Sequence, residues 1–203
     1  MVLSHALVGA IAGSGAEADT GSWHAIASTT LGSDTASVTF TSAGSSTAWS
    51  EFQDLVLLVA ARGTNTGAGI GVTTEINDDS GNYYYWQNIN SNGSSAGAAK
   101  TGPVGYFRPC HIPGSDRTAN FFGAAVVHFW DVNATNKHKM ILSLDGFEAA
   151  HASDDNSVVL RGSRWREAGT AAPDAMTKFV MNPDGNFLAG SQFDLYGVRT
   201  ATG

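Results

Sequence analysis

The stretch MTKFVMNPDGNFLAGSQFDLYGVR, residues 176–199, carries the clearest fold signal in the chain. Apolar and polar residues alternate on both sides of its centre, NPDGN, residues 182–186. Proline fixes φ at an early turn position, and Asp-Gly supplies a residue that tolerates a positive φ. We therefore expect two antiparallel strands joined by this turn, with one apolar and one solvated face. Because few residues follow Tyr196, we expect this pair to close the fold.

The rest of the chain reads as short strands separated by turn residues. Two runs, LVLLVAA (residues 55–61) and FFGAAVVHFWDV (residues 121–132), are apolar on consecutive positions, which predicts strands buried on both faces. Other strands are expected at residues 23–30, 36–41, 69–76, 83–89, 104–112, 137–144 and 158–165. Residues 90–102, rich in Asn, Ser, Gly and Ala, are expected to form a loop. About ten or eleven strands without a convincing helix predict an all-β fold, an antiparallel β-sandwich of jelly-roll type.

Composition bounds the class of protein. A chain of 203 residues with 24 glycines and only 14% charged residues suits tight turns and uncharged strand faces better than helices. A net charge of −7 argues against a nucleic-acid partner, which requires clustered Lys and Arg. No run approaches the roughly 20 apolar residues of a membrane-spanning helix, so we expect no membrane partner. We expect one β-sandwich domain over residues 21–203, preceded by an arm over residues 1–20.

The arm is apolar and interrupted by glycines. Its aliphatic side chains are Val2, Leu3, Leu7, Val8 and Ile11. A weak secretory signal peptide is one interpretation, but the basic region that starts such a peptide is missing. We favour an arm that packs on the domain or on a neighbouring subunit. Burial of these five aliphatic side chains would contribute a favourable free energy of roughly 1.5–3 kcal/mol each. This gain offsets the entropy cost of ordering the backbone only if the side chains lie in an apolar groove.

No motif for catalysis or for a cofactor is convincing. GSSAG, residues 93–97, matches the pattern of a nucleophile elbow but lacks the strand before it and the helix after it, so we attribute the match to chance. Cys110 is the only cysteine, which rules out an intrachain disulfide, and we expect it to be a small buried hydrophobe. Histidines and carboxylates do not show the sequence spacing of metal ligands. The alternative is a metal site whose ligands come from different strands, because sequence spacing does not reveal such a site. We therefore predict a protein that is not an enzyme, with no catalytic, cofactor-binding or metal-binding residues.

Aromatic residues cluster in YYYW, residues 83–86. In a strand, Tyr84 and Trp86 face one side while Tyr83 and Tyr85 face the other, so one pair should be core. We assign Tyr84 and Trp86 as candidate interface residues, with a sugar-stacking platform as the alternative.

Basic residues cluster in RGSRWR, residues 161–166. Within this cluster, Arg164 is the candidate interface residue, which would pair with an acidic surface of another subunit. A solvated cluster is the alternative.

Several stretches resemble a group of tailed-bacteriophage virion proteins. They are AIASTTLGSDTASVTFTS (residues 25–42), FQDLVLLVAARG (52–63), INDDSGNYYYW (76–86), NKHKMILSLDG (136–146) and GNFLAGSQFDLYGVR (185–199). Each stretch alone is ordinary strand and turn sequence, and their order and spacing carry the resemblance. Members of this group are capsid decoration (cement) proteins and tail-fibre or appendage domains.

The resemblance implies a β-sandwich component of the virion, usually homotrimeric and without catalysis. Because the chain lacks a collagen-like, coiled-coil or β-helical shaft, we expect a decoration protein that binds the major capsid protein and stabilises the head shell. A tail-fibre or appendage module that recognises host surface glycan is the second hypothesis. The resemblance supplies no functional residue.

Overall fold

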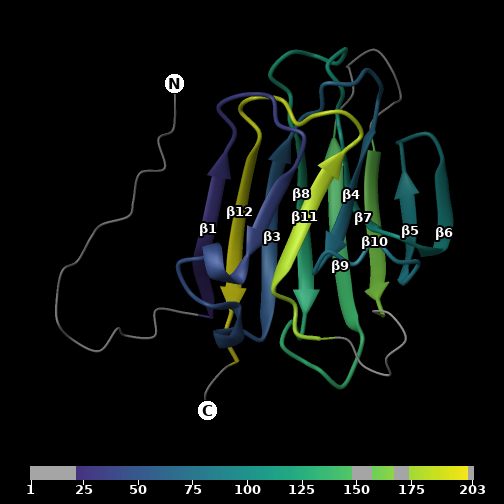
Figure 1. Cartoon of the computed structure of the whole chain (residues 1–203). Helices are drawn as coiled ribbons and strands as arrows, with labels where there is room; N and C mark the ends of the chain where they lie inside the picture. The colour runs from purple at the N-terminus through teal and green to yellow at the C-terminus, as the bar shows by residue number, and fades with distance from the viewer. Residues whose placement is uncertain (1–21, 148–156, 167–173, 201–203) are drawn as a thin grey trace.

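The computed structural model describes residues 22–147, 157–166 and 174–200 as two packed antiparallel β-sheets (Figure 1). The eight strands of the larger sheet, in spatial order, are β1 (Trp23–Thr30), β12 (Gln192–Val198), β3 (Asp54–Ala61), β8 (Gly123–Trp130), β9 (Lys139–Phe147), β10 (Ser157–Trp165), β5 (Tyr84–Ser91) and β6 (Ala96–Val104). The four strands of the smaller sheet are β2 (Val38–Thr41), β11 (Lys178–Pro183), β4 (Ile70–Ile76) and β7 (Phe107–Ile112). Two short 3-10 helices, η1 (Ser42–Gly44) and η2 (Trp49–Glu51), connect β2 to β3. No helix in these ranges is long and apolar enough to span a membrane.

The connectivity is that of a jelly roll, as predicted. The order β1-β12-β3-β8 in the larger sheet faces the order β2-β11-β4-β7 in the smaller one. From β1 to β4 each strand passes to the opposite sheet, and among the remaining strands of this set β4 and β7 lie in the smaller sheet, β8 in the larger, β11 in the smaller and β12 in the larger. These eight strands form the two sheets of a jelly roll with its Greek-key connections. The fold class predicted from the sequence is therefore confirmed, with twelve strands in the described residues.

The larger sheet continues beyond the jelly roll. The hairpin β5–β6 follows β4, the pair β9–β10 follows β8, and all four strands add to the sheet beside β8. We call β1, β12, β3 and β8 the jelly-roll half of the larger sheet, and β9, β10, β5 and β6 its added half. In Figure 1 the β5–β6 hairpin lies at the far edge of the added half.

Two predicted elements differ from the structure. β11 and β12 do not pair with each other, because β11 lies between β2 and β4 while β12 lies between β1 and β3. Residues 184–191 are long enough to cross the roughly 10 Å between packed sheets. The predicted loop at residues 90–102 contains most of β6, which pairs with β5. Asn92 closes this hairpin by accepting hydrogen bonds from the backbone N–H groups of Ser94 and Ser95, at 3.1 and 2.8 Å.

The main core lies between the two sheets. β3 is buried on both faces over most of its length, as its apolar run predicts. β8 was expected to be buried on both faces as well, and that prediction is wrong. Val127 and Phe129 face the core, whereas Val126 and Trp130 are 44% and 41% exposed on the opposite face. No described strand covers that opposite face, which we call the outer face of the larger sheet.

A buried ion pair fastens the added half to the smaller sheet. Arg161 on β10 pairs with Asp145 on β9, and both side chains point inward beneath β7. The second Asp145 oxygen accepts a hydrogen bond from the backbone N–H of His111 on β7 at 3.0 Å. A guanidinium nitrogen of Arg161 also contacts Nδ1 of the His111 ring. Partners for both Asp145 oxygens and for both terminal nitrogens of Arg161 offset the cost of burying these charges.

Candidate functional site

The added half exposes an apolar surface on the outer face. Alternation along β9 directs Met140, Leu142 and Leu144 outward, where they are 51%, 43% and 51% exposed. On β10, Val158 and Leu160 point the same way and are 59% and 39% exposed. Large exposed apolar patches on a protein surface mark interaction sites more often than isolated exposed residues do.

The same strands direct polar side chains inward. Lys139, Ser143 and Asp145 of β9 are each 2% exposed, and Arg161 and Ser163 of β10 are similarly buried. The Lys139 ammonium group donates to the carbonyl oxygen of Ala134. The usual arrangement of a sheet with one covered face is apolar inward and polar outward, and these two strands largely reverse it.

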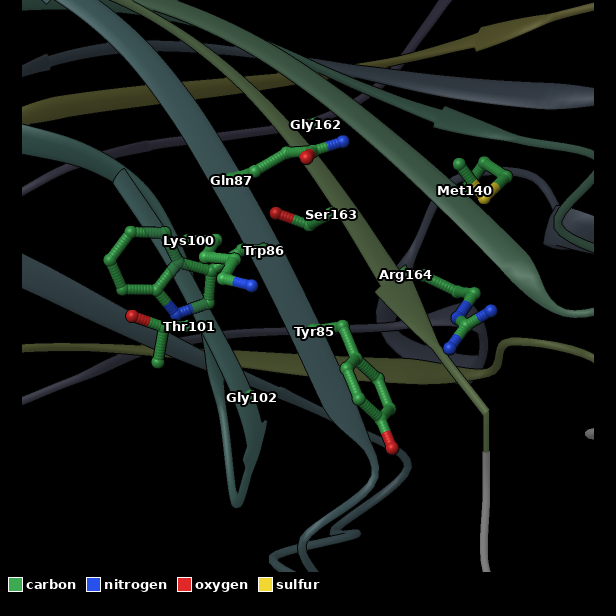
Figure 2. A pocket seen from close by; sticks show the side chains of 10 residues that line it. All are labelled: Tyr85, Trp86, Gln87, Lys100, Thr101, Gly102, Met140, Gly162, Ser163 and Arg164. Atoms are coloured by element: carbon green, nitrogen blue, oxygen red, sulfur yellow. The ribbon is translucent and has the colours of Figure 1, made fainter. Parts of the chain in front are cut away.

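A hollow of about 550 Å³ lies beside this surface, where β10, β5 and β6 meet (Figure 2). Gly162 forms part of its floor, since a Cβ atom there would meet nothing within 4 Å. The Arg164 guanidinium lies 4.7 Å from the centre of the Tyr85 ring, a cation–π contact that orders the rim. Lys100 and Thr101 of β6 lie near Trp86 on the other side of the hollow. The hollow therefore combines aromatic surface with hydrogen-bond donors.

The structure corrects one interface assignment in the aromatic strand. Tyr84 is fully buried, and its ring stacks between Phe107 and Trp165. Its hydroxyl accepts a hydrogen bond from the backbone N–H of Ile76 at 2.8 Å and donates to the Asp79 carbonyl at 2.9 Å. Tyr84 is therefore a core residue, because β7 covers the inner side of β5.

Trp86 and Arg164, the other assigned residues of this region, both line the hollow. Trp86 is partly buried against the core. Tyr85, on the opposite side of β5 from Tyr84, is the aromatic residue that reaches the outer face. The assigned arm residues Val2, Leu3, Leu7, Val8 and Ile11 lie outside the described residues, and their role stays a prediction.

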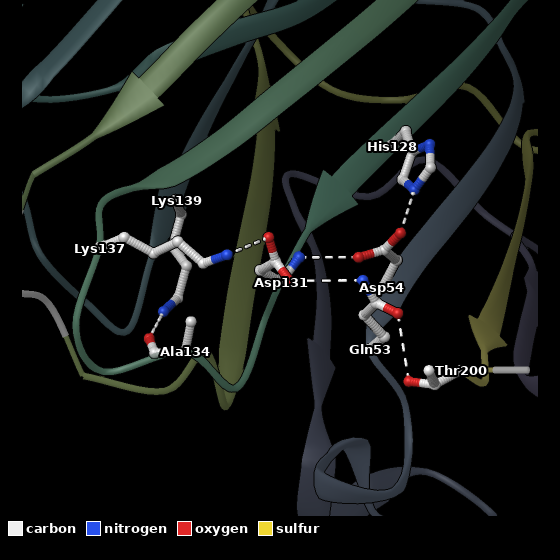
Figure 3. A network of polar contacts seen from close by, with 8 residues as sticks. All are labelled: Gln53, Asp54, His128, Asp131, Ala134, Lys137, Lys139 and Thr200. Carbon is white, nitrogen blue, oxygen red and sulfur yellow. Dashed lines mark hydrogen bonds and ion pairs between the residues drawn. The ribbon is translucent and has the colours of Figure 1, made fainter. Parts of the chain in front are cut away.

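A polar network joins one end of the larger sheet to the loop after β8 (Figure 3). Asp54 accepts a hydrogen bond from the backbone N–H of Asp131 at 2.7 Å, and its other oxygen lies 3.0 Å from Nε2 of His128. Lys137 pairs with the Asp131 carboxylate at 2.6 Å. For an Asp–His pair to activate a side-chain nucleophile, a hydroxyl or thiol must reach the histidine. None of the hydrogen bonds within the described ranges joins such a group to His128, so the network ties the loop to the sheet.

The other candidate nucleophiles occupy unsuitable positions. Ser95 lies in the β5–β6 turn, where its hydroxyl contacts the Asn92 side-chain oxygen at 3.1 Å. Cys110 is fully buried, and this burial raises the pKa of its thiol to about 12. Among the described residues, no cluster of three or more His, Cys, Asp or Glu side chains could hold a metal ion.

The exposed apolar surface corresponds to an alternating pattern in the sequence of β9. In KMILSL, residues 139–144, alternation places Met140, Leu142 and Leu144 on one face of a strand, and Lys139, Ile141 and Ser143 on the other. The pattern predicts a strand over residues 137–144 without assigning either face to the core. It is equally compatible with the observed orientation, because alternation alone does not say which face points to the core.

Comparison of the chain with protein-family models, curated proteins and solved structures gives no match.

Proposed function

We propose that this chain is a non-enzymatic structural protein of a bacteriophage virion, namely a decoration protein that binds the major capsid protein and stabilises the head shell as a homo-oligomer. The uncovered apolar outer face of the added half is the observation that carries the proposal, because burial of such a surface drives stable association. The resemblance of five ordered sequence stretches to phage virion proteins supplies the biological setting. The jelly-roll connectivity is compatible with that setting but is shared by proteins of many functions.

Purified virions test this proposal directly. Quantitative mass spectrometry should find the protein in many copies per particle, and cryo-electron microscopy should place it on the outer surface of the head. Few copies, or density confined to the tail, would reject the capsid assignment.

The arm gives a second experiment on the same proposal. We expect deletion of residues 1–15 to leave the melting temperature nearly unchanged and to weaken attachment to capsids. Full occupancy of capsids by the shortened chain would show that the arm is no anchor. Unfolding of the shortened chain would instead place the arm in the core of the domain.

Recognition of host surface glycan is the second candidate function, favoured by the hollow beside Tyr85. Aromatic rings offer apolar faces to sugars, and Arg164, Lys100 and Gln87 add hydrogen-bonding groups around them. Binding on a glycan array should be lost in Tyr85→Ala and in Trp86→Ala, whereas Thr30→Ala, on the distant β1 strand, should retain it. The absence of binding by the unaltered chain would remove this candidate.

A further inference from the structure

The outer apolar surface is built from side chains in register across five neighbouring strands. Leu58 on β3 lies opposite Val126 on β8, and Val126 lies opposite Leu144 on β9. The row continues through Leu160 on β10 to Ile89 on β5. Ile89, at the end of the row, is 60% exposed. The row forms a continuous apolar ridge across the sheet.

The rows beside this ridge add no charge to the surface. One neighbouring row consists of Ala60, Ala124, Gly146, Val158 and Ser91, and the other of Val56, His128, Leu142, Gly162 and Gln87. Neither row contains an Asp, Glu, Lys or Arg residue, although the whole chain carries 29 of them. Depletion of charge at the centre of a patch is typical of protein–protein interfaces.

The surface is large enough for a stable interface between subunits. Strands lie about 4.8 Å apart and outward residues repeat about every 6.8 Å, so five strands and three rows cover about 500 Å² in projection. Including the adjoining strands β12 and β6 raises this to about 700 Å². Standard protein–protein interfaces bury about 800 Å² per partner, and a projected area understates the area of a corrugated surface.

Charged groups flank this apolar centre with opposite signs on its two sides. Asp194 on β12 lies opposite Leu58, at the jelly-roll end of the ridge. Lys100 lies on β6 opposite Gln87, and Arg164 lies on β10, both at the far end of the face. An acidic side and a basic side on the same face are complementary to each other in a second copy of the chain.

We propose that a second copy of this chain covers the outer face, with the Asp194 side of one copy against the Lys100–Arg164 side of the next. When each copy offers its Asp194 side to one neighbour and its Lys100–Arg164 side to another, the contact is heterologous and forms a closed ring if its rotation closes. A trimer, expected from the resemblance, is one such ring, with Leu144 and Leu160 near its axis. This inference rests on the homo-oligomer of the proposed function and names the surface that forms it.

The mass of the purified full-length chain in solution, without capsids, tests the contact. Light scattering at about 50 μM should give a multiple of 21.1 kDa for the unaltered chain. Leu144→Asp should give the monomer mass, because it places a carboxylate in the apolar centre. Thr30→Asp, on the exposed outer side of β1 beyond the apolar centre, is the matched control and should keep the assembly. Circular dichroism should show that both variants remain folded, and Ile89→Lys should repeat the effect of Leu144→Asp.

Charge reversal tests the orientation of the copies. Lys100→Asp and Asp194→Lys should each weaken association about tenfold at low salt, because like charges then meet across the contact. The double variant should regain the affinity of the unaltered chain. A double variant as weak as the single ones would overturn the pairing of the Asp194 side with the Lys100–Arg164 side. A dimer mass for the unaltered chain would overturn the ring, because in a two-fold dimer both pairings form between the same two copies.

Other occupants of the face give distinct results. An unaltered chain that is monomeric at 50 μM overturns the inference. If Leu144→Asp then abolishes capsid binding, the face belongs to the capsid protein and the proposed function survives. If substitution of Leu7 and Val8 by Asp makes that monomer associate, its own arm covers the face. Absence of the protein from virion heads would refute the proposed function whatever the mass in solution.

Discussion

The two halves of the larger sheet have the same antiparallel pairing and differ in how polar and apolar side chains are divided between the inner and the outer face. In the jelly-roll half, β12 directs Phe193 and Leu195 inward, while Gln192 and Asp194 point outward. In the added half, β9 directs Lys139, Ser143 and Asp145 inward beside the apolar Ile141, and it directs three large apolar residues outward. Both halves bury apolar side chains against the smaller sheet, but the added half also exposes large apolar side chains on the outer face, the surface for which we propose a contact with a second copy of the chain.

Breaking the ion pair under the added half should have the largest effect on stability. We expect Arg161→Met to lower the free energy of unfolding by about 3–5 kcal/mol, because it leaves the Asp145 carboxylate buried without its partner. Urea denaturation followed by fluorescence measures this loss. Arg164→Met on the same strand, facing outward, is the control and should cost less than about 1 kcal/mol. Equal losses in the two variants would show that the pair does not fasten the added half.

A pH titration probes the same contact with a smaller expected effect. Burial, together with the neighbouring Arg161 and Arg108 cations, lowers the pKa of His111 from 6.5 to about 4. As the pH falls from 6.5 toward 4, the unfolded chain binds a proton that the folded chain does not, so this contribution to stability is complete above pH 6.5 and decreases below it. The loss should reach about 3 kcal/mol near pH 4.

Urea denaturation at pH 7 and pH 4.5 would measure this dependence. His111→Gln removes the titrating group and should show a smaller loss between the two pH values than the unaltered chain. The same pH dependence in both proteins would contradict the assignment.

The smallest predicted effects separate the two faces of a single strand. Val127→Thr on β8 should cost about 1–2 kcal/mol, because it buries a hydroxyl in the core. Val126→Thr, one residue away on the outer face, should change the stability of the isolated subunit by less than about 0.5 kcal/mol. The melting temperatures of the two variants, measured with dilute protein, would compare their stabilities. A large cost for Val126→Thr would mean that the outer face is already covered within one chain.

Sequence reasoning identified the fold class because strand alternation and turn residues are local signals. The apolar run LVLLVAA in β3 also predicted its central place in the sheet, because consecutive apolar residues are typical of a strand that is buried on both faces. The pairing of β11 with β12 was wrong because a turn sequence does not specify whether the chain returns to the same sheet or crosses to the other. β6 was missed because its Ala and Gly residues carry no strand propensity, and only its pairing with β5 defines it.

The candidate surface was harder to predict from the sequence than the fold. Arg164 and Trp86 were selected and do line the hollow, but the apolar outward residues of β9 and β10 were not selected. Their orientation depends on the partners in the buried cluster, above all Asp145 and Arg161, which are 16 residues apart in the sequence. That pairing is a tertiary contact and has no local signature.

The position of the last two strands governs how the chain is made in the cell. β12 separates β1 from β3, and β11 separates β2 from β4, so each sheet receives an inner strand from residues 178–198, which follow all the other strands in the sequence. While residues 178–198 are still within the ribosome, β1 and β2 have no partner strand and the jelly roll remains open. The sandwich therefore forms only after residues 178–198 have left the ribosome, in a step dominated by contacts between distant parts of the sequence, which makes folding slow. Until that step the unpaired strand edges depend on dilution or on a chaperone for protection from aggregation.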